Sequence, residues 1–271
     1  MNNPLALSSW TTHAMLGQVR YAHSFSNQPI LEEGAPADLT LLDLPQLAAS
    51  AGIAKLELCH FHFPTVEEAY LRQLKEKVEQ AGIELENILL DTGNLSNPND
   101  QAWKKSLEEA KAWQQVAAQC GAKGCRIDCG TEPPSDASKA RAAKALQILA
   151  DHGASLGLAT TTENFRTTSV YADDLLEIMG DSGRPLQLCV DYGNAKKSGD
   201  KYGTLKQLLP HGSSIHFKAE YLNGHIDRSE LHKGLTLARR AGFSGFITLI
   251  VDETVNEWEE TLALRDEILA F

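Results

Sequence analysis

Residues 137–164 have the sequence ASKARAAKALQILADHGASLGLATTTEN. The first part, residues 137–156, is rich in alanine, leucine and charged side chains and predicts an amphipathic helix. The run 158–162 contains three consecutive threonines, and β-branched residues favour strands. The polar pair Glu163 and Asn164 follows at once. This unit of a helix, a strand and polar residues at the strand's carboxyl end decides the fold, because it recurs along the chain.

The same alternation predicts eight strands, and helical runs separate most of them. The predicted strands are residues 5–10, 56–59, 86–90, 124–127, 158–162, 186–190, 213–215 and 246–251. The predicted helices are residues 44–51, 66–81, 101–120, 137–156, 171–179, 229–241 and 258–269. Several helices stop at Ala-Gly, where glycine takes the left-handed conformation that ends a helix.

Strands that alternate with helices imply parallel pairing and a sheet covered by helices. Eight such units in about 250 residues are typical of a closed (β/α)₈ TIM barrel, and we expect one domain over residues 1–271. An open doubly wound sheet is the alternative, but it normally has a glycine-rich phosphate turn after its first strand. The segment Ser8-Ser9-Trp10-Thr11 is not such a turn.

The composition limits the classes of function. Of 271 residues, 36 are acidic and 25 are basic, which gives a net charge of −11 with neutral histidines. Because contacts to phosphate need a basic surface, this charge counts against nucleic acid as a partner. No apolar run approaches the roughly 18 residues of a membrane span, and the N-terminus does not resemble a secretory signal. We therefore expect no membrane partner and a cytoplasmic location.

The cysteine content fits the same location. The chain has five cysteines, and an odd number without regular spacing is typical of a reducing compartment. Cys120, Cys125 and Cys129 suggest two interpretations, a metal cluster or buried small apolar residues. Their spacing matches neither common zinc pairing, which favours the second.

Polar side chains gather where the predicted strands end. These residues are His60, His62, Asp91, Arg126, Asp128, Glu163, Asn164, Asp191, Asn194, His216, Lys218, Glu220 and Asp252. In such barrels the catalytic groups lie at the carboxyl ends of the strands. Each residue alone is compatible with a solvated loop, whereas the whole set predicts a polar pocket.

Two carboxylates and an imidazole stand out within this set. Glu163, Asp191 and His216 lie at the ends of the fifth, sixth and seventh predicted strands. Such donors suit Mg²⁺, Mn²⁺ or Zn²⁺ better than a metal that prefers thiolates. The alternative is that the carboxylates cap the helices that follow and that His216 is a core histidine.

Other residues at the strand ends are candidates for substrate binding. His60 and His62 alternate along one predicted strand end and therefore share a face. They are ligands, substrate contacts or a proton shuttle, or else they pack at the barrel mouth. Trp10 is a candidate for stacking on the apolar face of a sugar. Asp91 and Arg126 bind hydroxyl groups or a carboxylate, or form a structural ion pair.

Four segments carry a resemblance to a known family. They are GLATTTEN at 157–164, CVDYGN at 189–194, IHFK at 215–218 and GFSGFI at 242–247. In this order they resemble motifs of the xylose isomerase-like TIM-barrel superfamily, which includes sugar isomerases, sugar epimerases, inosose dehydratases and apurinic endonucleases. The resemblance covers nearly the whole chain. It implies a barrel that acts on a small sugar-like molecule, with Asn194 among the substrate-binding residues, and a tendency to form homo-oligomers.

The resemblance also implies a ligand set. Members of the superfamily commonly bind a divalent metal through Glu, Asp, His and a second Glu, and by motif the first three are Glu163, Asp191 and His216. The usual position of the second Glu is occupied by Ile250, which has no donor atom. Asp252 shares a strand face with Ile250, so Asp252 or a water molecule would complete the shell.

The implied chemistry is sugar isomerisation or epimerisation assisted by Mn²⁺, Mg²⁺ or Zn²⁺. Glu163 is then the expected base that removes a proton next to a carbonyl, and Lys218 is the expected acid or oxyanion partner. Inverting a carbon needs an acid or base on each face, so Ile250 counts against the epimerases' chemistry. The alternatives are a metal-free sugar-binding barrel or non-catalytic subunit, a polyol-ketone dehydratase, and an apurinic endonuclease, against which the net charge counts.

Overall fold

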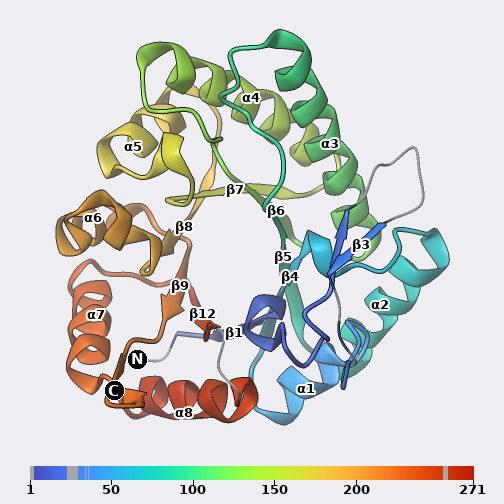
Figure 1. Cartoon of the computed structure of the whole chain (residues 1–271), viewed down its shortest axis with the longest axis vertical. Coiled ribbons are helices and arrows are strands. Elements are labelled where there is room, and N and C mark those ends of the chain that lie inside the picture. The colour runs from blue at the N-terminus through green and yellow to red at the C-terminus, as the bar shows by residue number, and fades with distance from the viewer. Residues whose placement is uncertain (1–2, 23–29, 34, 36, 253–255) are drawn as a thin grey trace.

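The structure, a computed structural model, describes residues 3–22, 30–33, 35, 37–252 and 256–271. Eight parallel strands form a closed barrel in the order β1-β12-β9-β8-β7-β6-β5-β4 (Figure 1). The barrel strands are β1 (Leu5–Ser8), β4 (Lys55–Cys59), β5 (Glu84–Leu90), β6 (Gly124–Ile127), β7 (Ala159–Glu163), β8 (Gln187–Asp191), β9 (Ser214–Lys218) and β12 (Phe246–Ile250). Because β1 pairs with both β12 and β4, the ring is closed, which excludes an open doubly wound sheet.

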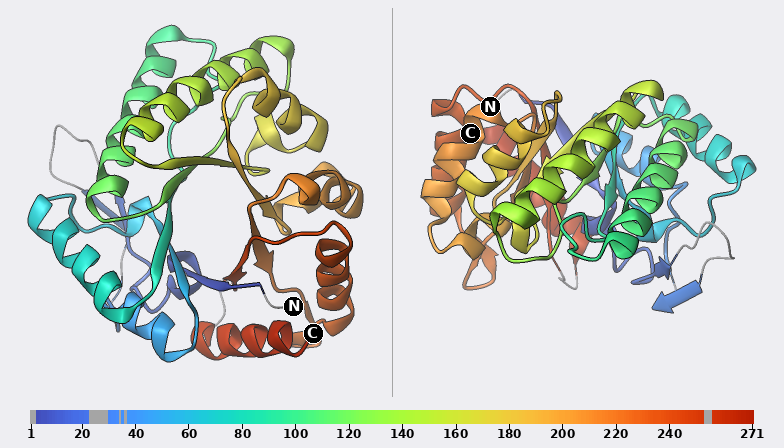
Figure 2. Two further views of the ribbon diagram at one scale, coloured as in Figure 1. Left: turned by 180° about the vertical axis from the view of Figure 1, so that it is seen from behind. Right: turned by 90° about the horizontal axis from the view of Figure 1, so that it is seen from above.

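The α-helices surround the barrel and cover its outer face, as Figures 1 and 2 show. They are α1 (Leu44–Ser50), α2 (Glu68–Ala81), α3 (Asp100–Gln119), α4 (Asp136–Ser155), α5 (Ala172–Asp181), α6 (Lys201–Leu208), α7 (Arg228–Arg240) and α8 (Glu257–Ala270). Local sequence sets their ends. Ser135 and Ser138 form a reciprocal capping box that begins α4. Gly82 ends α2 with a φ of 67°, which residues with a Cβ rarely adopt.

The apolar core lies between the strands and the helices. Leu74 of α2, Trp113 of α3 and Leu146 of α4 are fully buried in it. The inside of the barrel is more polar. For example, Thr248 of β12 donates a hydrogen bond at 2.7 Å to Glu57 of β4, on the other side of β1. Polar groups therefore already lie beneath the carboxyl end of the barrel.

The predicted fold is confirmed, with local differences from the predicted elements. Residues Ser9–Thr12 form a 3₁₀ helix rather than the end of a strand, because the Ser8 side chain accepts a hydrogen bond from the Trp10 backbone and turns the chain. The sequence pattern did not predict helix α6, because the helix is short and Gly203 weakens its helical pattern. Two hairpins were also not predicted, β2 (Arg20–Ala22) with β3 (Ile30–Glu33) and β10 (Tyr221–Leu222) with β11 (His225–Ile226).

Two further observations bear on the composition. Within the described part of the chain, no helix has the length and apolar character needed to cross a membrane. All five cysteines are buried as free thiols. Cys120, Cys125 and Cys129 pack in the apolar core, which supports their interpretation as small apolar residues.

Candidate active site at the carboxyl end of the barrel

A cavity of about 460 Å³ opens at the carboxyl ends of the barrel strands. Most of the residues predicted for the site line this cavity. These residues are Trp10, Asp91, Arg126, Glu163, Asp191, Asn194, His216, Lys218 and Asp252. Ile250 also lines it, so the apolar residue at the usual ligand position faces the same space as the polar groups.

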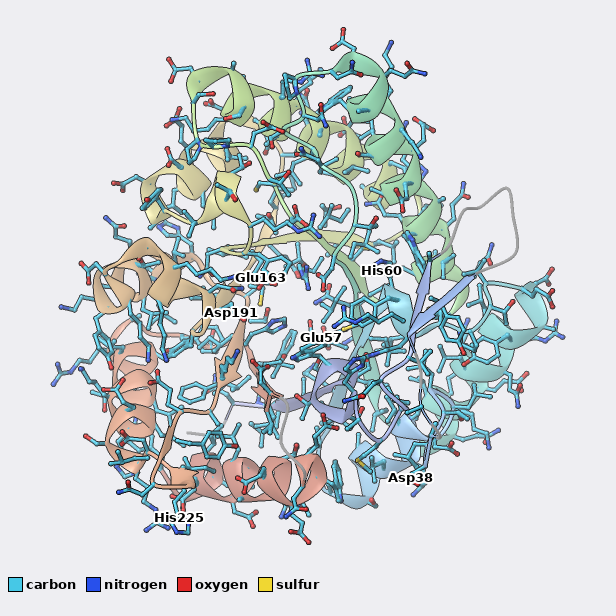
Figure 3. All side chains as sticks on the ribbon, in the orientation of Figure 1. Asp38, Glu57, His60, Glu163, Asp191 and His225 are labelled. Carbon is cyan, nitrogen blue, oxygen red and sulfur yellow. The ribbon has the colours of Figure 1, made fainter. Side chains whose placement is uncertain are left out.

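Glu163, Asp191 and His216 converge on one side of this cavity. They come from the neighbouring strands β7, β8 and β9, and Asp191 is paired in register with His216. His216 Nδ1 lies 3.8 Å from Glu163 Oε2 and 3.7 Å from Asp191 Oδ2. All three side chains are buried, and Figure 3 shows both carboxylates on the inner side of the ring. The structure therefore brings together the three groups that the sequence selected.

Glu57 of β4 holds the other nitrogen of His216. Its Oε2 lies 2.9 Å from His216 Nε2 and accepts a hydrogen bond from Thr248 at 2.7 Å, and its Oε1 accepts one from Asn87 at 2.8 Å. Burial opposes its ionisation, but the His216 charge and these hydrogen bonds lower the pKa of Glu57. Burial opposes the charged form of His216, but Cys189 and the carboxylates of Glu57 and Glu163 hold the pKa of His216 well above its ordinary value. Sequence reasoning missed Glu57, although a single acid within the apolar run Leu56–Cys59 was a usable signal.

Arg126 of β6 links two of the predicted carboxylates. Its NH1 atom lies 2.6 Å from Asp91 Oδ1, and its Nε atom lies 2.9 Å from Glu163 Oε2. The prediction left open a structural ion pair for Asp91 and Arg126, and that pair is present. Burial raises the pKa of Glu163 to about 7, although Arg126 and His216 favour its charged form. Glu163 is therefore poised to gain or lose a proton near neutrality.

The donor atoms of the cluster fit a divalent metal ion. Asn194 donates to Glu163 Oε1 at 2.9 Å, whereas the buried Oε2 faces Arg126 as an ion pair but accepts no hydrogen bond of regular geometry from the described residues. Glu163 Oε2, Asp191 Oδ2 and, after it loses its proton, His216 Nδ1 would offer two oxygens and a nitrogen, which suit Mg²⁺, Mn²⁺ or Zn²⁺. The thiol of Cys189 also lies close to Glu163 and His216. Burial raises the pKa of Cys189 to about 11, so it remains a thiol and is a poor ligand.

Asp252 is engaged with partners other than this cluster. One of its oxygens forms an ion pair with Lys218, and the other accepts a hydrogen bond from Trp10 Nε1 at 2.8 Å. Gly193 makes room for this arrangement, because a Cβ there would lie 2.6 Å from Lys218 Cδ. The structure thus places Asp252 opposite a cation, whereas the sequence interpretation offers Asp252 or a water molecule as the fourth metal ligand. Trp10 lines the cavity, and its ring stacks on His13.

His60 and His62 do not line the cavity. Residues His60–His62 form a 3₁₀ helix, so the prediction that they alternate along an extended strand end is wrong. The hydrogen bond from Phe63 N to His60 O closes this turn. His62 is buried, and its two ring nitrogens lie 2.8 Å from His13 Nδ1 and 2.9 Å from Ser9 Oγ. Both histidines therefore belong to the packing beneath the mouth, which was the alternative interpretation.

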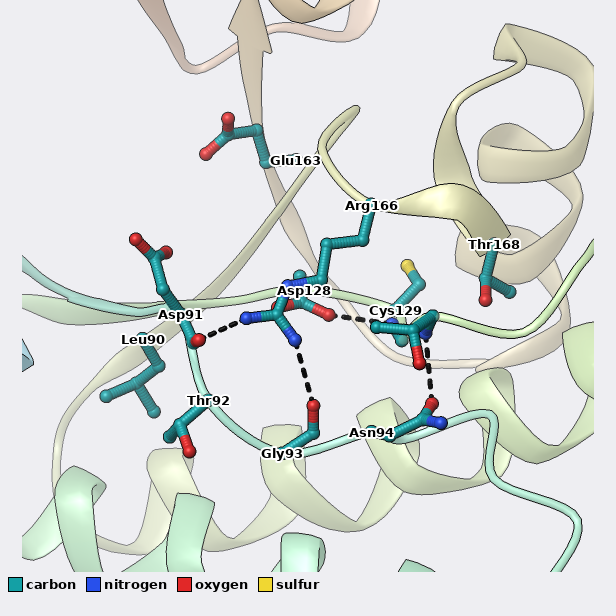
Figure 4. A network of polar contacts seen from close by, with 12 residues as sticks. Leu90, Asp91, Thr92, Gly93, Asn94, Asp128, Cys129, Glu163, Arg166 and Thr168 are labelled. Atoms are coloured by element: carbon teal, nitrogen blue, oxygen red, sulfur yellow. Dashed lines mark hydrogen bonds and ion pairs between the residues drawn. The ribbon is translucent and has the colours of Figure 1, made fainter. Parts of the chain in front are cut away.

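Arg166 is a further wall residue that the sequence analysis did not select. It lies three residues after Glu163, lines the cavity and binds the backbone carbonyls of Asp91 and Gly93, as Figure 4 shows. Its Nε also lies 3.3 Å from Asp128 Oδ2. Burial raises the pKa of Asp128 to about 6, although Arg166 favours its charged form. This network fixes the loop that carries Asp91.

The sequence matches a family model described as xylose isomerase-like TIM barrel over residues 45–265. The chain belongs to this family. The matched segment contains the Glu163, Asp191 and His216 cluster together with its partner Glu57. No curated protein matches the sequence. The sequence comparison therefore identifies the family but no individual relative.

Solved structures resemble this xylose isomerase-like barrel over its whole length. L-ribulose 3-epimerase superposes with a TM-score of 0.68 and 16% identity, covering 99% of this chain and 93% of that one. A probable 3-DHS dehydratase from Bacillus anthracis gives 0.68 and 15%, covering 99% of each chain. A xylose isomerase-like protein from Mycobacterium smegmatis, in complex with magnesium, gives 0.65 and 14%, covering 97% of this chain and 96% of that one. At these identities the likeness shows the fold alone.

Proposed function

We propose that this chain is a sugar isomerase-like enzyme that removes a proton next to the carbonyl of a small polyhydroxylated substrate with the help of a divalent metal. The observation that carries the proposal is the convergence of Glu163 Oε2, Asp191 Oδ2 and His216 Nδ1 on one cavity wall. Mn²⁺, Mg²⁺ or Zn²⁺ held by these atoms would supply a Lewis acid for the oxyanion that develops on the substrate. The epimerase and magnesium-bound neighbours support this direction.

Glu163 is the proposed base. Its raised pKa of about 7 suits proton transfer at neutral pH, because a base works best when its pKa lies near the working pH. Asn194 and Arg126 hold its two oxygens from different sides and so fix the carboxylate towards the cavity. One oxygen can serve as a metal donor while the other accepts the proton.

Lys218 is the proposed acid or oxyanion partner. Lys218 lines the cavity and forms an ion pair with Asp252. Ile250 favours isomerisation over epimerisation, because it offers no proton acceptor at the position where the superfamily's epimerases place their second base. A single base that moves a proton along one face suffices for a 1,2-isomerisation.

The proposal is tested by metal content and by hydrogen exchange. Protein purified without chelator is expected to contain about one Mn²⁺, Mg²⁺ or Zn²⁺ per chain, as three-donor sites of this kind do. In D₂O it should exchange the hydrogen next to the carbonyl of at least one aldose or ketose in a panel, followed by NMR. Glu163→Gln should lose both properties, whereas Glu76→Gln, on the exposed face of α2, should keep them. Wild-type protein without metal and without exchange would contradict the proposal.

A metal-free sugar-binding barrel, or a non-catalytic subunit, is the second candidate. It is favoured by Ile250 and by the ion pair of Arg126 with Glu163, since the guanidinium already supplies positive charge beside the cluster. It predicts sugar binding without metal and no change of Tm on adding metal. Dehydration of a polyol ketone would begin with the same proton removal, and loss of a hydroxyl group in the NMR experiment would identify it.

We further propose the setting in which the enzyme works. Residues 1–271 would act as one domain in the cytoplasm, with a small molecule as the partner rather than nucleic acid or a membrane, and copies would associate as a homo-oligomer. The net charge of −11 supports the exclusion of nucleic acid. Light scattering on the purified chain tests the oligomer, and incubation with abasic DNA, which should stay intact, tests the exclusion.

A further inference from the structure

The charge of the cavity wall differs from that of the whole chain. The chain has a net charge of −11, yet basic side chains outnumber acidic ones on the wall. The basic residues are Arg20, Arg126, Arg166, Lys197 and Lys218, and the acidic residues are Asp91, Glu163, Asp191 and Asp252. The wall is thus near charge balance, whereas the chain as a whole is acidic. Whether it attracts an anion depends on which of these charges already have a partner.

Several of these charges are neutralised within the wall. Arg126 pairs with Asp91, and Lys218 pairs with Asp252. Arg166 is used by backbone carbonyls and by Asp128 behind the wall. These contacts hold the wall in place, because the basic side chains donate to carboxylates and carbonyls of the protein rather than to a ligand.

Lys197 is different, because it forms no ion pair with a residue that the structure describes. It lies in the 3₁₀ helix Asn194–Ser198 directly after β8 and lines the cavity. Its ammonium lies 5.3 Å from the centre of the Phe165 ring. The adjacent Lys196, which does not line the cavity, is paired with Glu220 at 3.0 Å. The lysine beside the cavity is thus the one whose charge remains available.

Arg20 adds positive charge at another part of the same mouth. Its guanidinium lies 5.3 Å from the Trp10 ring and 4.9 Å from the Phe61 ring. Each of the two cations therefore rests on an aromatic side chain, which restrains a flexible group. A ligand that spans the cavity meets apolar rings and positive charge at its rim, and the acid–imidazole cluster deeper inside.

We infer that the substrate is a polyhydroxylated carboxylic acid, whose carboxylate pairs with Lys197 at the rim while its carbonyl end faces Glu163 and His216. This inference rests on the proposed function, because it names the class of substrate for that site. A cavity of about 460 Å³ holds a molecule the size of a six-carbon sugar acid.

Carboxylate rather than phosphate is the favoured anion. Phosphate in these barrels commonly binds near the last two strands, at a helix N-terminus. Here Asp227 accepts hydrogen bonds from the Ser229 and Glu230 backbones at the start of α7. The first turn of α8 contains three glutamates. Acidic side chains thus occupy both helix starts and would repel a phosphate.

The test compares matched ligands on Mn²⁺-loaded protein by isothermal titration calorimetry. The pairs are D-glucuronate with D-glucose, D-galacturonate with D-galactose, and 2-keto-D-gluconate with D-fructose, and glucose 6-phosphate and fructose 6-phosphate form the phosphate arm. We expect at least one acid to bind about tenfold or more tightly than its neutral partner, the effect of one charge-assisted pair. Lys197→Gln should remove this difference, whereas Lys197→Arg and Lys196→Gln should retain it.

Three results would overturn the inference. They are that no acid binds more tightly than its neutral partner, that a sugar phosphate is preferred to every carboxylate, or that Lys196→Gln has the same effect as Lys197→Gln. Because Lys197 is exposed, its substitution should leave folding intact, which circular dichroism checks. Metal content and hydrogen exchange, measured separately, distinguish each of these results from a failure of the proposed function.

Discussion

Glu57 and His216, 159 residues apart in sequence, form a buried carboxylate–imidazole pair with 2.9 Å between Oε2 and Nε2. Because the ionised carboxylate accepts from Nε2, the opposite nitrogen Nδ1 is the one presented to Glu163 and Asp191. Metal-binding histidines are generally oriented in this way by a second hydrogen bond. The pair therefore connects the floor of the cavity to the atoms that would do chemistry above it.

The first prediction concerns Glu57→Gln. The substitution removes the charge that orients His216 but keeps the size of the side chain, so we expect the affinity for Mn²⁺ to fall about 10- to 100-fold. Titration of chelator-treated protein with Mn²⁺, followed by electron paramagnetic resonance, measures this. Glu76→Gln serves as the control for loss of one surface charge. Unchanged Mn²⁺ affinity in Glu57→Gln would show that the pair has only a structural role.

The second prediction concerns pH and Glu163 in chelator-treated protein. Burial raises the pKa of Glu163 to about 7 from an ordinary 4.5, so the folded state binds this proton more tightly than the unfolded state does. The resulting stabilisation is complete below about pH 4.5 and is lost as the pH rises through about 7.

Urea unfolding of wild type and Glu163→Gln measures this effect. Relative to the variant, the wild type should lose about 2 kcal/mol of unfolding free energy between pH 5 and pH 8. Equal pH profiles for the two proteins would mean that Glu163 titrates at its ordinary value. The same ionisation should make Mn²⁺ binding weaken as the pH falls below 7, because a ligating carboxylate must lose its proton.

The third prediction concerns Ile250→Glu. Ile250 is 6% exposed and is paired in register with Lys218, so a carboxylate there would face the cavity. We expect Mn²⁺ to bind about tenfold more tightly, or about 1.4 kcal/mol. The chelator-treated variant should be less stable than wild type, because the new charge is then unpaired. Ile250→Met is the control that keeps the wall apolar, and equal Mn²⁺ affinity in the two variants would contradict the prediction.

The fourth prediction concerns Gly193→Ala. The φ of Gly193 is −69°, so alanine is not strained there, but its Cβ would displace the Lys218 side chain from its place beside Asp252. We expect hydrogen exchange on the substrate to slow by about 10- to 100-fold, as a misplaced catalytic group causes, with little change in Tm. Gly180→Ala, where nothing lies within 4 Å of the new Cβ, should leave the exchange rate unchanged. Normal exchange in Gly193→Ala would remove Lys218 from the mechanism.

The barrel was predictable because each strand and helix has its own local pattern of apolar residues, and their alternation permits few other arrangements. The elements that escaped prediction depend on contacts that a local pattern does not contain. The turn at His60–His62 is one example, because its residues resemble the continuation of β4. The short helix α6 is another, because Gly203 weakens its pattern.

The candidate site was predictable in part for the same reason. Strand ends locate Glu163, Asp191 and His216, since the parallel strands of a barrel all end on one face. The partners of these residues depend on distances across the ring. Glu57 lies on a strand far from β9 in sequence, and the pairing of Asp252 with Lys218 depends on how far the lysine stem reaches over Gly193. Neither distance is encoded in spacing along the chain.

The closure of the ring through β1, β12 and β9 has a consequence for biosynthesis. Strand β12 is the last of the eight to leave the ribosome, and until it inserts, β1 and β9 each keep one unpaired edge. His216 lies on β9, so the imidazole gains its final surroundings only at this late step. A nascent chain that stalls before residue 246 would expose two unpaired strand edges, which favour aggregation. It would already contain Asp91, Glu163 and Asp191, but the closed cavity that brings them together would not yet have formed.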